Sequence, residues 1–129
     1  MNKIIVQISV GELLDKISIL EIKKEKKKDK KKLKFIDHEH KILNSQYNEN
    51  VTNNEKIKKL FQSLKKVNLK LWDIEDDKRL CEKEKNFGDN FIKLSREVHF
   101  LNDDRAQLKL EINNLSGSII KEIKEYTSY

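Results

Sequence analysis

Proline is absent from this chain of 129 residues, and glycine occurs only three times. Both residues punctuate turns, so their scarcity excludes a fold of many short elements and favours a few long helices. The single cysteine, Cys81, excludes a disulfide within the chain and is typical of a reducing compartment. The longest apolar stretch, residues 4–10, is interrupted by Gln7 and Ser9 and is too short for a membrane span. It also lacks the cleavage region of a signal peptide, so we expect a cytoplasmic protein.

Charge is plentiful but unevenly distributed. Residues 23–34 hold nine lysines and two acidic residues, a net charge of +7, whereas the whole chain carries +6, so the remaining residues sum to −1. Such a run could bind nucleic acid, anionic lipid or an acidic partner. It could equally be a solvated helix end in a chain rich in Lys, Asn and Ile. The run contains no arginine and has only Phe35 beside it, whereas nucleic-acid sites usually mix arginine and stacking rings with lysine.

Charged residues make up 39% of the chain and the mean hydropathy is −0.79, values that could suggest disorder. The 36% of hydrophobic residues, however, recur at helical spacing, which favours a folded chain. β-Branched residues predict a short extended lead-in over residues 1–8. Ser9, followed three positions later by Glu12, predicts a helix N-cap with a capping box, and the first helical hairpin is expected over residues 9–47. Its two apolar stripes are Leu13, Leu14, Ile17, Leu20 and Ile22, then Leu33, Ile36, His40, Leu43 and Tyr47.

A longer second hairpin is predicted over residues 53–116. Thr52 or Asn53 can cap its first helix, the letters NFGD supply its turn, and Gly117 ends its second helix before a tail at 117–129. The two helices carry matched stripes whose steps alternate between three and four residues, which is typical of an antiparallel coiled-coil hairpin. The stripes are Ile57, Leu60, Leu64, Val67, Leu71, Ile74, Lys78 and Cys81, then Phe91, Leu94, Val98, Leu101, Arg105, Leu108, Ile112 and Leu115.

Trp72 indicates that the two hairpins pack together. At 3.6 residues per turn it shares a second helix face with Phe61, Asn68, Glu75 and Arg79, about 90° from the seam. A large indole on that face is expected to be buried, and both helices of the first hairpin are the simplest cover. The predicted fold class is therefore all-α: antiparallel helical hairpins that form a four-helix, coiled-coil-like bundle with a short extended N-terminal segment.

Arg105 occupies a seam position between Leu101 and Leu108. Burying a guanidinium without a partner costs several kcal/mol, so an anion should meet it, and Glu75 and Asp76 are candidates. Polar residues beside the seam could line a cleft that binds an anionic small molecule. An internal salt-bridge network that sets the helix register would explain the same residues. The candidate cleft comprises Lys16, Asn68, Trp72, Glu75, Arg79, His99, Asn102, Arg105 and Lys109.

Motifs for metal binding and catalysis are missing. His38 and His40 are two residues apart and point to different sides of a helix, and the Glu-x-x-His repeat of metal-binding bundles does not occur. Cys81 has no histidine nearby and is expected to be a packing residue. Glycine-rich phosphate loops and serine nucleophile motifs do not occur either. We therefore predict no catalytic residue, no metal site and no cofactor.

Three segments carry a resemblance: GELLDKISILEIK (11–23), VNLKLWDIEDDKR (67–79) and FGDNFIKLSREVHFLNDDRAQLKLEINNLSGS (87–118). Together they resemble a family of small, uncharacterised all-α proteins of bacteria and phages, a domain of unknown function whose members appear beside sugar-transfer and surface-polysaccharide proteins. His99 departs from the pattern, which has a tyrosine there. The positions that match the family are Asp15, Lys16, Asn68, Trp72, Glu75, Asp76, Arg79, Asn102, Asp103, Arg105 and Lys109.

These observations favour a non-catalytic helical module that binds a protein partner or a small anionic ligand. The resemblance implies a link to surface-polysaccharide or phage–host metabolism. One alternative is an enzyme or sensor that binds a nucleotide or nucleotide sugar in the cleft. Another is docking on nucleic acid through residues 23–34. A homodimer is also compatible with the sequence, because a second chain could pack against the apolar seam of the second hairpin or pair with the extended segment.

Overall fold

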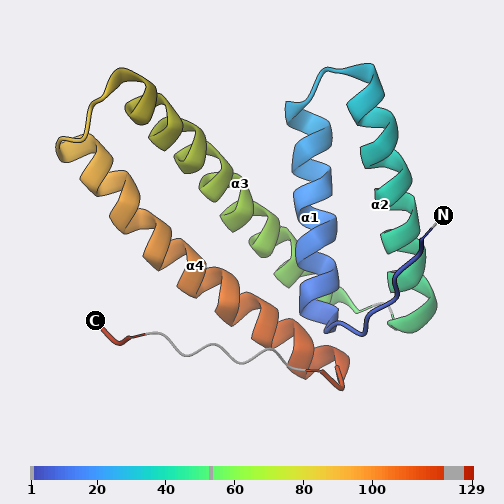
Figure 1. Cartoon of the computed structure of the whole chain (residues 1–129). Helices are drawn as coiled ribbons and strands as arrows, with labels where there is room; N and C mark the ends of the chain where they lie inside the picture. The colour runs from blue at the N-terminus through green and yellow to red at the C-terminus, as the bar shows by residue number, and fades with distance from the viewer. Residues whose placement is uncertain (1, 53, 121–126) are drawn as a thin grey trace.

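The computed structural model describes residues 2–52, 54–120 and 127–129, and over these residues the chain forms α-helices and no strand. Figure 1 shows α1 lying between α2 and the hairpin of α3 and α4, whose far end extends away from the other two helices. The predicted all-α arrangement of two helical hairpins is confirmed. The helices are α1 (Val10–Lys26), α2 (Lys30–Asn50), α3 (Glu55–Glu84) and α4 (Asp89–Ser116).

α1 begins where its cap was predicted. The Ser9 hydroxyl oxygen accepts a hydrogen bond from the backbone N–H of Glu12 at 3.0 Å. The helix ends at Lys26, within the lysine run, whose like charges repel one another along a helix. α1 has more buried residues than any other described helix, because it packs against all three. Its buried residues are Gly11, Leu13, Leu14, Asp15, Ile17, Ser18, Leu20 and Ile22.

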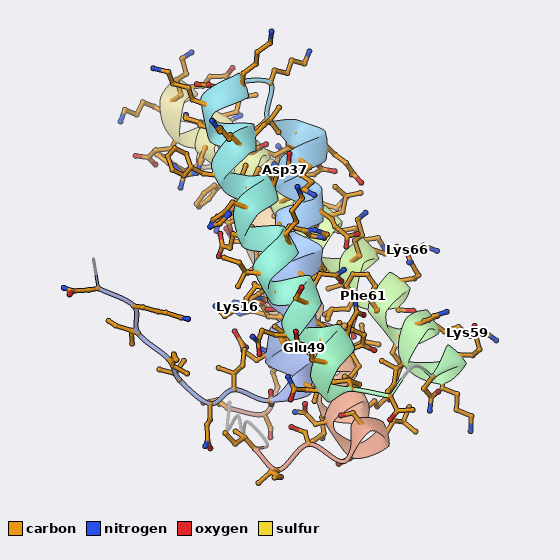
Figure 2. All side chains as sticks on the ribbon, turned by 90° about the vertical axis from the view of Figure 1, so that its right-hand side faces the viewer. Lys16, Asp37, Glu49, Lys59, Phe61 and Lys66 are labelled. Atoms are coloured by element: carbon orange, nitrogen blue, oxygen red, sulfur yellow. The ribbon has the colours of Figure 1, made fainter. Side chains whose placement is uncertain are left out.

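α2 is the least buried helix, and it lies on the outside of the molecule (Figure 2). In the described chain its backbone packs against α1 alone and does not approach α3 or α4. The expectation that both helices of the first hairpin cover the Trp72 face is therefore wrong. α1 lies between α2 and the hairpin (Figure 1), and Trp72 stays half-buried. The predicted inner stripe of α2 is correct but only half-buried: Leu33, Ile36, His40, Leu43 and Tyr47.

The boundaries of the second hairpin differ from the prediction at one cap. α2 continues to Asn50, and α3 is capped by Asn54, whose side-chain oxygen accepts from the backbone N–H of Lys56 at 2.8 Å. The predicted cap at Thr52 is wrong, and Asn53 lies outside the described residues. Gly117 ends α4 as predicted, with a φ of 68° in the left-handed region that glycine adopts without strain.

The apolar core forms two clusters. The first lies where α1 crosses the base of the α3–α4 hairpin, and Leu64 and Ile112 within it are fully buried. The second lies further along the hairpin, where only α3 and α4 contribute. It consists of Ile74, Cys81 and Leu94 with half-buried neighbours around them. Cys81 is thus a buried packing residue.

The predicted lead-in has no regular secondary structure over residues 2–8, and the side chains of Ile4, Ile5 and Val6 are largely exposed. Of the predicted tail, residues 121–126 lie outside the described part of the chain. None of the described helices is long and apolar enough to cross a membrane.

Candidate functional site

Asp15 is the centre of a polar cluster between α1, α3 and α4. The residue is 2% exposed, and its carboxylate accepts hydrogen bonds from two of these helices. Arg105 of α4 donates from Nε at 3.0 Å and from Nη2 at 2.5 Å, one bond to each carboxylate oxygen. Asn68 of α3 donates from Nδ2 at 2.8 Å. Such a two-pronged guanidinium–carboxylate pair is among the strongest polar contacts in proteins.

Lys109 brings a second carboxylate into the cluster. Its Nζ donates to Oε2 of Glu12 at 2.6 Å and lies 3.9 Å from Oδ2 of Asp15. The lysine side chain is 8% exposed, so this ion pair is largely withdrawn from water. Two cations, Arg105 and Lys109, therefore face two anions, Asp15 and Glu12.

Ser18 and Asn68 satisfy the remaining polar atoms around Asp15. Nδ2 of Asn68 donates to the Ser18 hydroxyl oxygen at 2.7 Å, and that hydroxyl donates to the backbone carbonyl of Asp15 at 2.7 Å. Among the described residues, every buried side-chain nitrogen and oxygen has a hydrogen-bond partner. A fully satisfied polar network in a core holds its helices in one arrangement.

Gly11 allows α1 and α4 to touch at the edge of this network. Its backbone N–H donates to Oδ1 of Asn113 at 2.7 Å. A Cβ at this position would lie 2.6 Å from the backbone oxygen of Lys109, so only glycine fits. We refer to these residues as the Asp15 cluster: Gly11, Glu12, Asp15, Ser18, Asn68, Arg105, Lys109 and Asn113.

The ionisation of Asp15 depends on its neighbours. Burial raises the pKa of this carboxyl group, because a charge loses its hydration. Hydrogen bonds from Arg105 and Asn68, together with the positive charges of Arg105 and Lys109, outweigh burial and hold the pKa below its ordinary value of 3.8. The cluster therefore favours the charged carboxylate.

The lowered pKa of Asp15 predicts sensitivity to acid. A carboxyl group of this kind contributes stability that is fully present above its unfolded pKa and is lost as pH falls through the lower folded pKa. We expect the free energy of unfolding of the wild type to decrease as the pH drops below about 4. The free energy of unfolding of Asp15→Asn should decrease less over the same pH range. Urea denaturation at a series of pH values measures both. Parallel pH profiles for the two proteins would contradict this role.

The structure brings together three of the nine candidate cleft residues: Asn68, Arg105 and Lys109. The acids expected to meet Arg105 are the wrong ones, because Glu75 and Asp76 are exposed on α3 and Asp15 of α1 takes their place. Six candidates lie outside the cluster. Lys16 is exposed near Glu12, Trp72 and Asn102 are half-buried, and Glu75, Arg79 and His99 are exposed.

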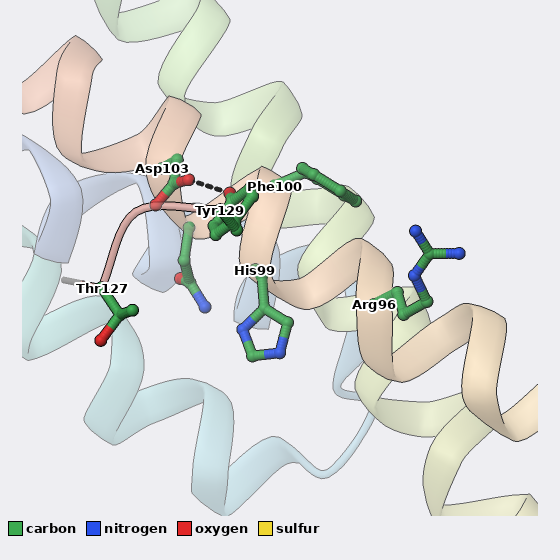
Figure 3. Close-up of a pocket in the computed structure, with 7 residues that line it drawn as sticks. Arg96, His99, Phe100, Asp103, Thr127 and Tyr129 are labelled. Atoms are coloured by element: carbon green, nitrogen blue, oxygen red, sulfur yellow. Dashed lines mark hydrogen bonds between the residues drawn. The ribbon is translucent and has the colours of Figure 1, made fainter.

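His99 and Asn102 instead line a hollow of about 560 Å³ on another part of α4 (Figure 3). The Tyr129 hydroxyl donates to the Asp103 carboxylate there, and the rings of Tyr129 and Phe100 meet edge to face at 5.4 Å. None of the Asp15 cluster residues lines this hollow. Trp72 has a different neighbour, the Lys27 ammonium, at 5.6 Å from the ring centroid.

Several members of the cluster were not among the site residues predicted from the sequence: Gly11, Glu12, Asp15, Ser18 and Asn113. The signal was present in the motifs, since GELLDK contains the first three and EIN contains Asn113. A glycine one position into a helix is unusual, and the close approach to α4 explains it. Ser18 carries no comparable signal, because a serine in a helix interior ordinarily faces solvent.

Within the described residues, no group of His, Cys, Asp and Glu is arranged to hold a metal ion. The chain matches no curated protein and no solved structure. One family model matches it over residues 4–129, which is nearly the whole chain and includes every member of the Asp15 cluster. The chain therefore belongs to DUF6165, a family of unknown function.

Proposed function

We propose that this chain is a non-catalytic helical interaction module, which binds a protein partner through the free end of the α3–α4 hairpin. The observation that carries the proposal is that its buried polar cluster is balanced internally. Arg105 and Lys109 pair with Asp15 and Glu12, so each of these cations already has an anionic partner within the fold. An anionic ligand would have to compete with two carboxylates that are already in place, which disfavours the metabolite-binding alternative.

The free end of the hairpin supports a role in protein binding. At the end of α1, the first hairpin contacts α3 through the ion pair of Lys26 with Asp73 and the cation–π contact of Lys27 with Trp72. Beyond this point α3 and α4 extend away from α1 and α2 (Figure 1). Apolar side chains are exposed there, each about half: Leu80, Phe87 and Ile92 at 51%, 49% and 53%. Apolar groups presented on a rigid helical scaffold are typical of a recognition surface.

Site-specific photo-crosslinking tests this proposal. We expect that replacing Phe87 with the photoreactive analogue p-benzoylphenylalanine yields one defined protein adduct in cells that naturally make the chain. The matched control places the same analogue at Ile42, an apolar residue on α2 that is 49% exposed, as Phe87 is. Equal labelling at both positions, or no adduct at Phe87, would count against the hairpin as a binding surface.

A thermal-shift panel of nucleotides and nucleotide sugars tests the alternative. A ligand at 100 times its Kd stabilises a native protein by about 2.7 kcal/mol, enough to raise the melting temperature by several degrees. The proposed function predicts no such shift. If a shift appears and is lost in Asn102→Ala, the ligand binds in the hollow lined by His99 and Asn102. If it is lost in Lys16→Gln, the ligand binds beside Glu12 at the edge of the Asp15 cluster.

The setting of the partner is also part of the proposal. The motifs resemble those of bacterial and phage proteins that appear beside surface-polysaccharide enzymes, so we expect the partner to belong to surface-polysaccharide or phage–host metabolism. The identity of the crosslinked adduct decides this point directly. A partner from an unrelated process would refute the assignment while leaving the interaction role in place.

A further inference from the structure

The turn between α1 and α2 concentrates positive charge at one end of the molecule. The lysine run 23–34 covers the last residues of α1, the turn and the start of α2. Figure 2 shows side chains that end in nitrogen gathered around this turn, at the top of the view. Of the exposed lysines there, five take part in no ion pair or ring contact among the described residues: Lys28, Lys30, Lys31, Lys32 and Lys34.

The other half of the run has a structural role. Lys24 pairs with Asp37 at 2.9 Å, and Lys26 pairs with Asp73 at 3.1 Å. The acids of the run are also engaged: Glu25 pairs with Lys65 at 2.9 Å, and Asp29 caps α2. Glu25 is therefore engaged elsewhere, and the single charge of Asp29 leaves most of the charge of the five lysines uncompensated.

These five lysines are placed where the fold gains nothing from them. Lys30, Lys31 and Lys32 occupy the first turn of α2, which contains no acidic residue. The N-terminus of a helix is the positive end of its dipole, so cations there repel it and weaken the helix. A charge that costs stability without an internal partner is best explained by an external anion.

We propose that the α1–α2 turn docks on a membrane surface rich in anionic lipids. Phe35 is 77% exposed and lies three and four positions after Lys32 and Lys31, so its ring shares their side of α2. Exposed lysines attract anionic headgroups, and an aromatic ring beside them can enter the headgroup boundary. The lysines supply attraction over a distance and Phe35 supplies a shallow apolar anchor.

The same observations favour lipid over nucleic acid. The run contains no arginine, the residue whose planar fork suits specific phosphate and base contacts, whereas lysine acts as a point charge. A single exposed ring offers no stacking platform for successive bases. The turn between two helices is also convex, which suits contact with a flat charged surface. Single-stranded nucleic acid is instead usually bound in a positively charged groove. The inference does not depend on the proposed function, because it rests on the α1–α2 turn and not on the tip of the α3–α4 hairpin (Figure 1).

Vesicle co-sedimentation of the full chain tests the inference. We expect binding to phosphatidylcholine vesicles containing about one-third phosphatidylglycerol, weak binding to phosphatidylcholine alone, and loss of binding at high salt. Each lysine near an anionic surface contributes about fivefold to partitioning, so Lys30, Lys31, Lys32 and Lys34 changed together to Gln should reduce binding about a hundredfold or more. The melting temperature of this variant should be unchanged or raised, because the helix end loses repulsive charges.

A matched control removes the same charge elsewhere. Lys56, Lys59, Lys66 and Lys83 are all exposed on α3, and changing these four to Gln should reduce vesicle binding far less. Phe35→Ser should weaken binding several-fold while leaving its salt dependence in place. The proposal is overturned if both quadruple variants bind anionic vesicles equally. It is also overturned if the wild type binds an oligonucleotide but not the vesicles under the same conditions, which would assign the turn to nucleic acid. Neither outcome would affect the crosslinking test at Phe87.

Discussion

Asp15→Asn is expected to lower the free energy of unfolding by about 3 kcal/mol, because breaking a buried ion pair leaves its other charge uncompensated. The carboxylate is 2% exposed and accepts both prongs of Arg105, so asparagine cannot replace its charge or both of its acceptor oxygens. Arg105 is 30% exposed and can recover some hydration, which places the expected cost near the lower end for such pairs. Urea denaturation followed by circular dichroism at neutral pH measures the change.

Asp104→Asn provides the control for this experiment. Asp104 is an exposed aspartate on α4, so its substitution should change the free energy of unfolding by less than about 0.5 kcal/mol. Arg105→Met completes a double-mutant cycle. Because each single variant leaves a charge without its main partner, the double variant should be more stable than the sum of the two losses predicts, by about 1–3 kcal/mol. A loss below about 1 kcal/mol for Asp15→Asn would show that the cluster does not hold α1 on the hairpin.

Gly11→Ala is expected to destabilise the protein by about 2 kcal/mol or more, although alanine favours helices over glycine by about 1 kcal/mol. The new Cβ would lie 2.6 Å from the backbone oxygen of Lys109 and 2.9 Å from Oδ1 of Asn113. The backbone oxygen belongs to a regular helix and cannot rotate away as a side chain can. α1 and α4 would therefore have to separate, which strains the 2.7 Å hydrogen bond from the Gly11 N–H to Asn113.

Gly88→Ala is the matched control for the glycine substitution. The nearest atom to a Cβ at Gly88 is Oδ1 of Asn86 at 3.4 Å, and the φ of Gly88 is −80°, which any residue adopts. Because Gly88 is the N-cap of α4, where alanine is less favourable than glycine, its substitution should lower the free energy of unfolding by about 1 kcal/mol or less. Thermal and urea denaturation of the two variants side by side provide the comparison. If Gly11→Ala is as stable as Gly88→Ala, the close contact between α1 and α4 has no energetic importance.

The caps and apolar stripes were predictable because they depend on local chemistry. Ser9 and Gly117 end helices through contacts within a few residues, and a stripe at helical spacing needs no knowledge of the partner helix. The start of α3 was less predictable. Thr52, Asn53 and Asn54 are adjacent residues with similar capping preference, so local energy barely separates them. Packing decides instead: the cap at Asn54 places Ile57 in the first apolar cluster.

The candidate site could be predicted only in part. A guanidinium at the seam position of Arg105 needs an anion, and that requirement follows from the sequence alone. Which anion meets it does not follow, because Asp15 and Arg105 are separated by 90 positions and become neighbours only when α1 crosses the hairpin. Glu75 and Asp76 were the candidates that the matched stripes of the second hairpin suggested, but both are exposed to solvent on α3.

The sequence by itself determined that this protein is helical, where most helices begin and end, and which faces are apolar, because those properties arise from interactions over a few residues. Only the tertiary structure decided which helices meet. It placed α1 alone against the hairpin, paired Asp15 with Arg105, and left the lysines of the α1–α2 turn exposed. The physical reason is that helix packing depends on complementary shape and charge between distant segments, such as the gap that Gly11 leaves for α4, and neither is encoded in the period of a single helix.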